Sequence, residues 1–487
     1  MRRVLFPLLP IVLLACQDMS AAGDDLSGQA AAVLIAPDDL ADDLQVLADW
    51  RCQTGLPTEL VRLGDALDAG EGADDAARLR AYLTGRYEDG GLEHVILGGD
   101  SDVMPYREIW ATVAVDAEQV NEETYVTSDL YFADLDGDWD PDGDGEYGEL
   151  DDPADLFPDV SIGRLPVETS GEVRAYVDKL MAYERSDHLD YQDKLLLAAS
   201  YAGLGVYASV GIELIVVPEL PDHLRLTRLY EDFDDHDGAV ELTADSFEKA
   251  MEEGHNVTFQ MGHGNEKTLG PLLGSSAIEG IDNEARPNIL ITTECLGGRF
   301  DYGSQDSSGE VFVLGESGGV AYLGATHLGI GFPSFSLIMQ DLAGALFSGN
   351  DGGTIRLGST VTEVLRGYSS EEAMHTEANV DRWTNLVTVL LGDPTVPVWS
   401  TRPRPLELAV DKVGTCEGVE VAVTTRDGAP VASAVVTAFS PDELLLRAIT
   451  DDEGVARLVV DDCLFEGATI TASGPDYVPA VVEFDSL

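Results

Sequence analysis

The chain has 487 residues, of which 44% are hydrophobic, and this length predicts two to four folded domains. With 28 basic and 90 acidic residues, its formal net charge is −62, which would repel phosphate backbones and anionic headgroups. The composition therefore excludes a collagen, a coiled coil and a wholly disordered chain, and it argues against nucleic acid as a partner.

The first residues have the pattern of an export signal. Arg2 and Arg3 precede an apolar run at residues 4–14, which is too short to cross a bilayer. The run ends in Leu-Leu-Ala before Cys16, which resembles a bacterial lipobox, where the signal is cut before a cysteine that becomes lipidated. A plain secretory signal with an incidental cysteine is the alternative. We expect a signal peptide at 1–16, a polar tether at 17–30 and an extracytoplasmic protein, secreted or held at the membrane only by its lipid.

Residues 31–187 begin with alternating strand and helix patterns. Near-continuous apolar strands between helices indicate a mostly parallel sheet with helices on both faces. The strands are expected at 32–36, 57–63, 94–100 and 160–164, and the helices at 38–53, 73–87 and 170–185. Cys52 lies on one of these helical patterns and is expected in the core.

A polar segment at 101–157 contains a loop that fits the twelve-residue EF-hand template for calcium. Gly143 falls at position six, where the template needs a sharp turn, and its flanks are not helical. We expect a structural Ca²⁺, because such an acidic run repels itself without a counter-ion; a solvated acidic loop is the alternative. The expected ligands are Asp138, Asp140, Asp142, Asp144, Glu146 and Glu149. No organic cofactor is expected.

Residues 188–400 continue the α/β pattern, and two of their strands end in reactive residues. Gly-His-Gly at 262–264 follows the strand at 256–261, and Cys295 follows the strand at 288–293. Because ligands bind at the carboxyl ends of parallel strands, adjacent strands would place His263 and Cys295 side by side. An imidazole can activate a thiol or protonate a leaving amine, and neighbouring glycines can leave amides free for an oxyanion. A structural cysteine and an ordinary His-Gly turn are the alternative.

The period of the pattern changes to two beyond a Pro-containing linker at 401–405. Residues 401–487 are therefore expected to form an all-β sandwich of immunoglobulin-like type. Cys416 and Cys463 both lie in this segment and could form a disulfide in an oxidising compartment.

These motifs resemble the gingipain-type cysteine peptidases, which are relatives of the caspases, over about residues 30–487. Besides Gly-His-Gly and Glu-Cys, the resemblance is carried by the segments 94–100, 127–132, 162–166, 391–395 and 474–479. It implies a doubly wound, mostly parallel α/β sheet of caspase-like type in two subdomains, followed by an immunoglobulin-like domain.

The resemblance also implies endopeptidase activity on protein or peptide substrates. Cys295 would attack the scissile carbonyl, and His263 would protonate the leaving amine and later activate water. The backbone amides of Gly264 and Cys295 would hold the oxyanion.

The resemblance leaves the substrate pocket less defined. The pocket aspartate of arginine-specific members falls at Glu213, which could select a basic P1 residue. The pocket aromatic falls at Phe332, a family glutamate is replaced by Ala202, and His327 has no assigned role.

We expect a monomer, and two other functions stay open. The chain could be a catalytically silent surface-binding or adhesion lipoprotein that acts through its β-sandwich. It could also be a transpeptidase that processes exported proteins, in which an amine instead of water resolves the acyl-enzyme.

Overall fold

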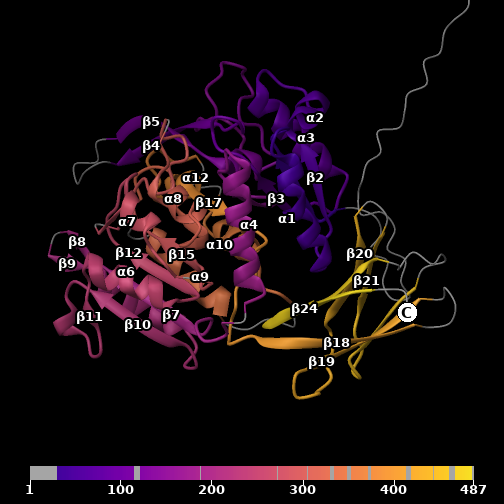
Figure 1. Cartoon of the computed structure of the whole chain (residues 1–487). Helices are drawn as coiled ribbons and strands as arrows, with labels where there is room; N and C mark the ends of the chain where they lie inside the picture. The colour runs from indigo at the N-terminus through magenta and orange to yellow at the C-terminus, as the bar shows by residue number, and fades with distance from the viewer. Residues whose placement is uncertain are drawn as a thin grey trace, which may run out of the picture.

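An eleven-stranded sheet forms the centre of the first 400 residues (Figure 1). Its strands in spatial order are β11 (Val240–Glu241), β10 (Arg225–Tyr230), β7 (Lys194–Ala199), β12 (Val257–Met261), β15 (Asn288–Thr292), β16 (Gly319–Ala325), β17 (Thr388–Gly392), β6 (Ser161–Arg164), β3 (His94–Leu97), β1 (Ala32–Ala36) and β2 (Thr58–Arg62). The computed structural model describes residues 30–114, 121–186, 188–203, 205–270, 272–283, 285–303, 305–329, 334–347, 353–370, 375–412, 418–441, 444–459 and 467–484.

Neighbouring strands of this sheet are parallel except β16 and β17, which are antiparallel. The two ends of the sheet therefore run in opposite directions. Strands β1, β2, β3 and β6 come from residues 31–187 and the others from residues 188–400, and the two groups meet where Leu391 pairs with Arg164. The expected α/β architecture is present, and both parts of the chain contribute to one continuous sheet.

Helices cover both faces of the sheet, as the apolar strands predicted. In β1, Leu34 and Ala36 belong to one hydrophobic core, and Val33 and Ile35 belong to another. This alternation is the period of two of a strand that is buried on both faces. The helices are α1 (Ala41–Gln53), α2 (Leu63–Ala69), α3 (Asp75–Glu88), α4 (Ser170–Glu184), α5 (Ser209–Gly211), α6 (Ala244–Glu253), α7 (Ser275–Glu279), α8 (Ser308–Leu314), α9 (Ser336–Phe347), α10 (Leu357–Arg366) and α12 (Val380–Val387).

Short antiparallel hairpins lie outside the main sheet and were not predicted. The polar segment at 101–157 contains β4 (Glu108–Ala114) and β5 (Asn121–Thr127). The others are β8 (Tyr201–Gly203) with β9 (Val206–Tyr207), and β13 (Thr268–Leu269) with β14 (Leu273–Gly274). The strands of the last two hairpins have only two or three residues, too few to show a hydrophobic period, so sequence patterns did not reveal them.

The C-terminal residues form a separate all-β unit with its own core. Its strands lie in the order β21 (Leu444–Ile449), β20 (Val435–Ser440), β23 (Thr469–Gly474), β24 (Tyr477–Glu483), β18 (Arg404–Lys412), β19 (Val419–Thr425) and β22 (Val455–Leu458). Because β22 also lies beside β21, the seven strands form a nearly closed sheet. The all-β expectation is confirmed, whereas the immunoglobulin-like type stays a prediction. The expected linker at 401–405 is shorter, since β18 begins at Arg404.

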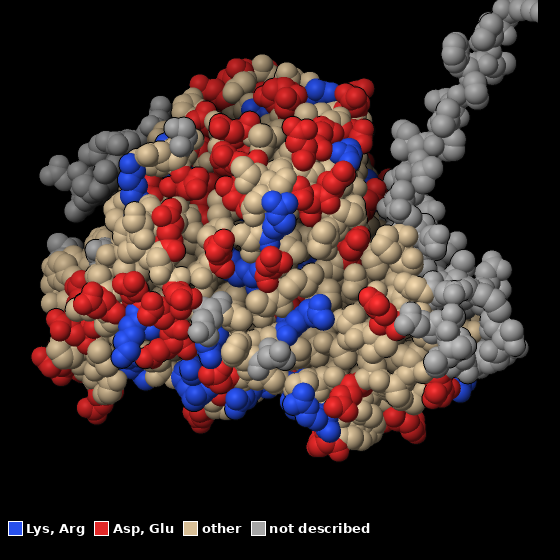
Figure 2. Space-filling view, in the orientation of Figure 1, with Lys and Arg blue, Asp and Glu red and all other residues tan. Residues whose placement is uncertain are grey.

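Acidic side chains dominate the face of the molecule in Figure 2, notably over the N-terminal region around α2 and α3. Lysine and arginine side chains are fewer there. None of the helices within the described ranges is long and apolar enough to cross a membrane.

Four residues with predicted roles lie outside the described residues: Cys16, Phe332, Cys416 and Cys463. The lipid anchor, the pocket aromatic and the disulfide therefore stay predictions.

Candidate active site

His263 and Cys295 follow two neighbouring parallel strands. In the register of β12 and β15, Gln260 lies opposite Thr292, and the Gly262 amide donates to Thr293 Oγ1 at 3.3 Å. The structure thus brings the ends of the two strands together, as the sequence predicted. His263 is exposed and Cys295 is half-buried, so the imidazole faces solvent and the thiol lies deeper.

The turn that carries Cys295 is fixed to the end of β16. The Leu296 amide donates to the His327 carbonyl at 2.9 Å, and the Gly298 amide donates to the Ala325 carbonyl at 3.0 Å. Leu296 has φ +64°, a left-handed conformation that leucine rarely adopts. The Cys295 thiol lies 3.7 Å from the Gly329 carbonyl, and its burial raises the pKa of this thiol.

The two predicted oxyanion amides are available for a ligand. Among the described residues, neither the Gly264 nor the Cys295 backbone amide donates a hydrogen bond to a protein acceptor. Gly264 also has no room for a side chain, since a Cβ there would lie 2.4 Å from Glu294 Oε2. A larger residue would move the loop that carries His263.

Helix α8 contacts the loops that carry His263 and Cys295 through its first residues. The Ser308 amide donates to the Glu266 carbonyl at 2.7 Å, close after His263. The next amide, from Gly309, donates to the Gly297 carbonyl at 2.8 Å, close after Cys295. The helix begins at a capping box in which Ser307 and Glu310 bond reciprocally. The start of α8 therefore fixes the two loops relative to each other.

Glu213 is already paired in the structure. It lies in the helical turn Ile212–Val216, and its Oε1 accepts from Arg228 Nε and Tyr230 OH, both at 2.7 Å. These contacts lower the pKa of the Glu213 carboxyl despite its partial burial. A substrate arginine would have to displace Arg228, so this geometry gives no support to Glu213 as an acidic pocket residue.

The surface formed by the segments before and around Glu213 exposes apolar side chains. The hairpin β8–β9 follows β7, which pairs with β12, and it exposes Tyr201 and Tyr207 in edge-to-face contact at 5.3 Å. Val210 and Leu214 are exposed on the following turns. The strands β8 and β9 are too short to show a sequence pattern, so this exposed apolar surface was not predicted.

His327 packs at the end of β16 rather than standing free on the surface. Its ring meets Trp383 edge-on at 5.3 Å, and burial lowers the pKa of the imidazole. Its carbonyl accepts the Leu296 amide described above. The residue thus supports the nucleophile turn through its backbone.

The predicted calcium loop brings part of its expected ligand set together. Carboxylate oxygens of Asp140, Asp142 and Asp144 lie within 4.8 Å of one another, which is a spacing that one cation can bridge. Gly143 has φ +72°, as the sharp turn requires. The other three predicted ligands, Asp138, Glu146 and Glu149, do not belong to this group.

A second acidic group lies in the same polar segment and was missed because Asp155 is distant in sequence from its other two members. It consists of Asp134, Asp136 and Asp155, and burial raises the pKa of the Asp134 carboxyl to about 7.

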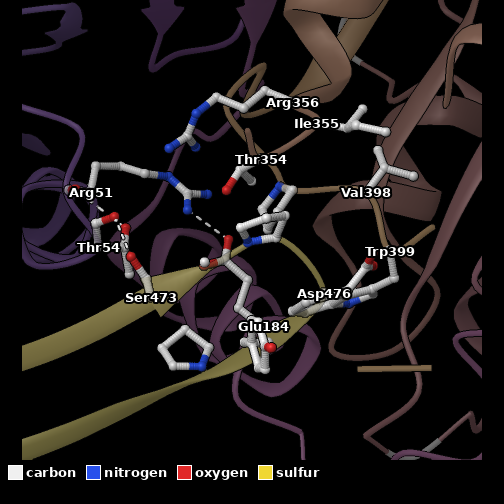
Figure 3. A pocket seen from close by; sticks show the side chains of 15 residues that line it. Arg51, Thr54, Glu184, Thr354, Ile355, Arg356, Val398, Trp399, Ser473 and Asp476 are labelled. Carbon is white, nitrogen blue, oxygen red and sulfur yellow. Dashed lines mark hydrogen bonds and ion pairs between the residues drawn. The ribbon is translucent and has the colours of Figure 1, made fainter. Parts of the chain in front are cut away.

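A pocket at the junction with the C-terminal unit lies apart from this site (Figure 3). Arg51 and Arg356 extend into it, and Arg51 forms ion pairs with Glu184 at 2.6 Å and Asp393 at 2.7 Å. Neither His263 nor Cys295 lines this pocket. Arg356 donates to the Thr395 carbonyl at 2.7 Å, and Asp476 accepts from Ser400, so the charged groups of this pocket already have protein partners.

The fold and the site together define a class: α/β proteins with a histidine and a cysteine at the carboxyl edge of a parallel sheet. Comparison with known families then identifies the family within this class. The family model of peptidase family C25 matches residues 25–399, and the chain belongs to this family.

Curated relatives include Lys-gingipain W83 from Porphyromonas gingivalis, 23% identical over 286 residues, which cover 57% of this chain and 14% of that protein. Gingipain R2 from Porphyromonas gingivalis (strain ATCC BAA-308 / W83) is 22% identical over 280 residues, which cover 55% of this chain and 32% of that protein. The chain thus matches no more than a third of the length of these relatives.

Two solved structures share the fold. One is a crystal structure of the Arg specific cysteine proteinase gingipain R, with a TM-score of 0.70 at 17% identity, covering 94% of this chain and 98% of that one. The other is a complex of the pro- and mature domains of Porphyromonas gingivalis RgpB, with a TM-score of 0.71 at 17% identity, covering 94% and 99%.

Proposed function

We propose that this protein is a cysteine endopeptidase with Cys295 as nucleophile and His263 as general acid and base. The observation that carries the proposal is the placement of these two residues after neighbouring parallel strands, beside two backbone amides that bond to no described protein acceptor. Membership of peptidase family C25 supports it.

The reaction follows from the positions of these groups. The Cys295 thiolate forms a bond to the scissile carbonyl carbon, and the amides of Gly264 and Cys295 stabilise the negative charge on the carbonyl oxygen. The carbon–nitrogen bond then breaks, and His263 gives a proton to the leaving amine. Water then attacks the acyl carbon and gives a proton to His263, and the carbon–sulfur bond breaks, which releases the acid and restores the Cys295 thiolate beside a protonated His263.

The proposal extends to the location, the oligomeric state and the metal site of the protein. We infer that the protein acts outside the cytoplasm as a monomer, held by a lipid on Cys16 and accompanied by an immunoglobulin-like C-terminal domain. A structural Ca²⁺ would be held by Asp140, Asp142 and Asp144, whose mutual spacing suits an oxygen-binding cation.

The test is digestion of a proteome-derived peptide library with the purified protein, followed by mass spectrometry of the products. Cleavage by the wild-type protein and its absence in Cys295→Ala and His263→Ala are expected. His223→Ala is the matched control, because this histidine contacts the Ser400 carbonyl away from the site. The absence of any cleavage by a folded wild-type protein would favour the surface-binding alternative.

The same products identify the substrate. Cleavage after basic residues would support a role for Glu213, whereas cleavage beside apolar residues would point to the hairpin β8–β9. An added amine nucleophile separates hydrolysis from transpeptidation, since only a transpeptidase would transfer the acyl group efficiently to that amine.

A further inference from the structure

Glu294 is a buried carboxyl group, one residue before the nucleophile, that the reaction above does not use. Its side chain is fully buried, and no lysine, arginine or histidine within the described ranges lies close enough to form an ion pair with it. An isolated carboxylate is costly to bury, and this burial raises the pKa of Glu294 to about 8. Burial therefore favours the neutral form of this carboxyl.

The hydrogen bonds of Glu294 join two other elements. Its Oε2 accepts from the Gly270 amide at 2.6 Å, and its Oε1 accepts from the Tyr322 hydroxyl at 2.9 Å. Gly270 lies in the hairpin β13–β14, which continues from the His263 loop, and Tyr322 lies in the middle of β16. The side chain thus connects the chain after His263 to the strand that supports the nucleophile turn.

The glycines around Glu294 show how closely it fits. A Cβ on Gly264 would lie 2.4 Å from Oε2, and a Cβ on Gly297 would lie 2.5 Å from Oε1. The carboxyl group therefore contacts the backbone of the His263 loop on one side and of the Cys295 turn on the other. The Gly264 and Cys295 amides, which are proposed to bind the oxyanion, belong to these two backbones.

We propose that Glu294 is a positioning residue that sets the separation of the two oxyanion amides by filling the space between the catalytic loops. The proposal rests on the peptidase function proposed above. It does not place Glu294 in contact with the substrate, because the side chain has no exposed surface.

The neutral form suits this role. The titratable groups that interact with Glu294 are the Tyr322 hydroxyl on β16 and the Cys295 thiol on the adjacent turn. After burial, the charge of an ionised Glu294 is a second cause that raises the pKa of the Cys295 thiol, so the neutral form of Glu294 favours the thiolate.

The test compares Glu294→Gln and Glu294→Ala with the wild-type protein on the best library peptide. Glutamine keeps the shape and the acceptor oxygen, so we expect kcat within about fivefold of wild type. Alanine leaves the amides unsupported, so we expect kcat to fall about 100-fold with KM nearly unchanged, as when an oxyanion donor is lost. Glu59→Ala is the matched control, since Glu59 is a buried glutamate on β2, at the far edge of the sheet, where it pairs with Arg86 of α3.

A pH profile separates positioning from general stability. In Glu294→Gln, the midpoint for alkylation of Cys295 should shift to lower pH, because no charge can develop beside the thiol. A folded Glu294→Ala protein with kcat within about threefold of wild type would overturn the positioning role alone. If Glu294→Ala does not fold, Glu294→Asp replaces it, since the shorter side chain cannot reach both Gly270 and Tyr322. An undiminished kcat in Glu294→Asp would likewise overturn the positioning role. A wild-type protein that cleaves nothing overturns the proposed function first, and the positioning role with it.

Discussion

Leu296 determines how the turn after the nucleophile is held. Its φ of +64° costs a residue with a Cβ about 1–2 kcal/mol, and β-branched side chains tolerate this region least. Leu296→Val is therefore expected to shift the turn, lowering kcat/KM at least about tenfold and the melting temperature by a few degrees. Leu296→Gly should keep kcat/KM within about threefold, since glycine adopts this conformation freely.

The neighbouring Leu328 provides the control for this prediction, because its φ is not positive. Leu328→Val should leave both kcat/KM and the melting temperature nearly unchanged. Equal losses in Leu296→Val and Leu328→Val would show that side-chain packing, and not the backbone of the turn, is responsible.

The residues of the site differ in how far the sequence could reveal them. His263 and Cys295 follow apolar runs directly, so the strand pattern predicts where they lie. Glu294 could not be assigned a role in this way, because its partners Gly270 and Tyr322 are 24 and 28 residues away and meet it only through the sheet order. Glu213 was assigned to the pocket from its position in the sequence alone, which cannot show that its carboxylate already forms an ion pair with Arg228.

Helix α8 is the element that fixes the two catalytic loops relative to each other. Removing its cap with Ser307→Ala should destabilise the protein by about 1 kcal/mol. Because the following amides bond the Glu266 and Gly297 carbonyls, the same change should also lower kcat several-fold. Urea unfolding and steady-state kinetics measure the two effects.

Helix α4 offers a matched control, since Thr169 caps it through an equivalent capping box with Glu172. Thr169→Ala should destabilise by a similar amount and leave kcat unchanged. A loss of kcat in both variants, in proportion to stability, would contradict a specific role for α8.

Calcium binding to the acidic loop should stabilise the folded protein. Binding to the folded state alone stabilises it by RT ln(1 + [L]/Kd), or about 2.7 kcal/mol when the ligand is at 100 times Kd. Millimolar Ca²⁺ should therefore raise the melting temperature, a chelator should reverse this, and Asp142→Asn should abolish most of the rise. Asp234→Asn is the control, as this aspartate is exposed on a distant turn. A melting temperature that is independent of Ca²⁺ would favour the solvated loop.

Elements were predictable where burial imposes a pattern. Strand β15 (Asn288–Thr292) is buried throughout and reads as a continuous apolar run between helices. Strand β5 begins Asn-Glu-Glu-Thr, a polar sequence that pairs only with β4, so neither composition nor period indicates a strand. The fold of the sheet was thus accessible from sequence, whereas the surface hairpins depend on contacts that a local pattern does not contain.

At the scale of the whole molecule, the C-terminal unit packs against α1. The Ser473 hydroxyl donates to the Thr54 carbonyl at 2.9 Å, and the Thr437 hydroxyl donates to the Gln53 carbonyl. Phe439 forms a small buried cluster with Leu445 and Cys52, the last from the catalytic part. Figure 1 shows β20 beside the end of α1. These contacts should make the two parts unfold together.

Phe439→Ala tests this coupling, because truncating a buried phenylalanine costs about 3–5 kcal/mol and here removes the apolar contact between the two parts. We expect the wild-type protein to unfold in one calorimetric transition and Phe439→Ala in two. In the variant, Cys52 should react with a thiol reagent below the main transition, as read by mass spectrometry of its peptide. Leu446→Ala, in the core of the C-terminal unit itself, should destabilise that unit while leaving Cys52 protected. If Phe439→Ala keeps one transition and an unreactive Cys52, the hydrogen bonds between the two parts, such as those to residues 53 and 54 and from Ser400 to Asp476, hold them together without this cluster.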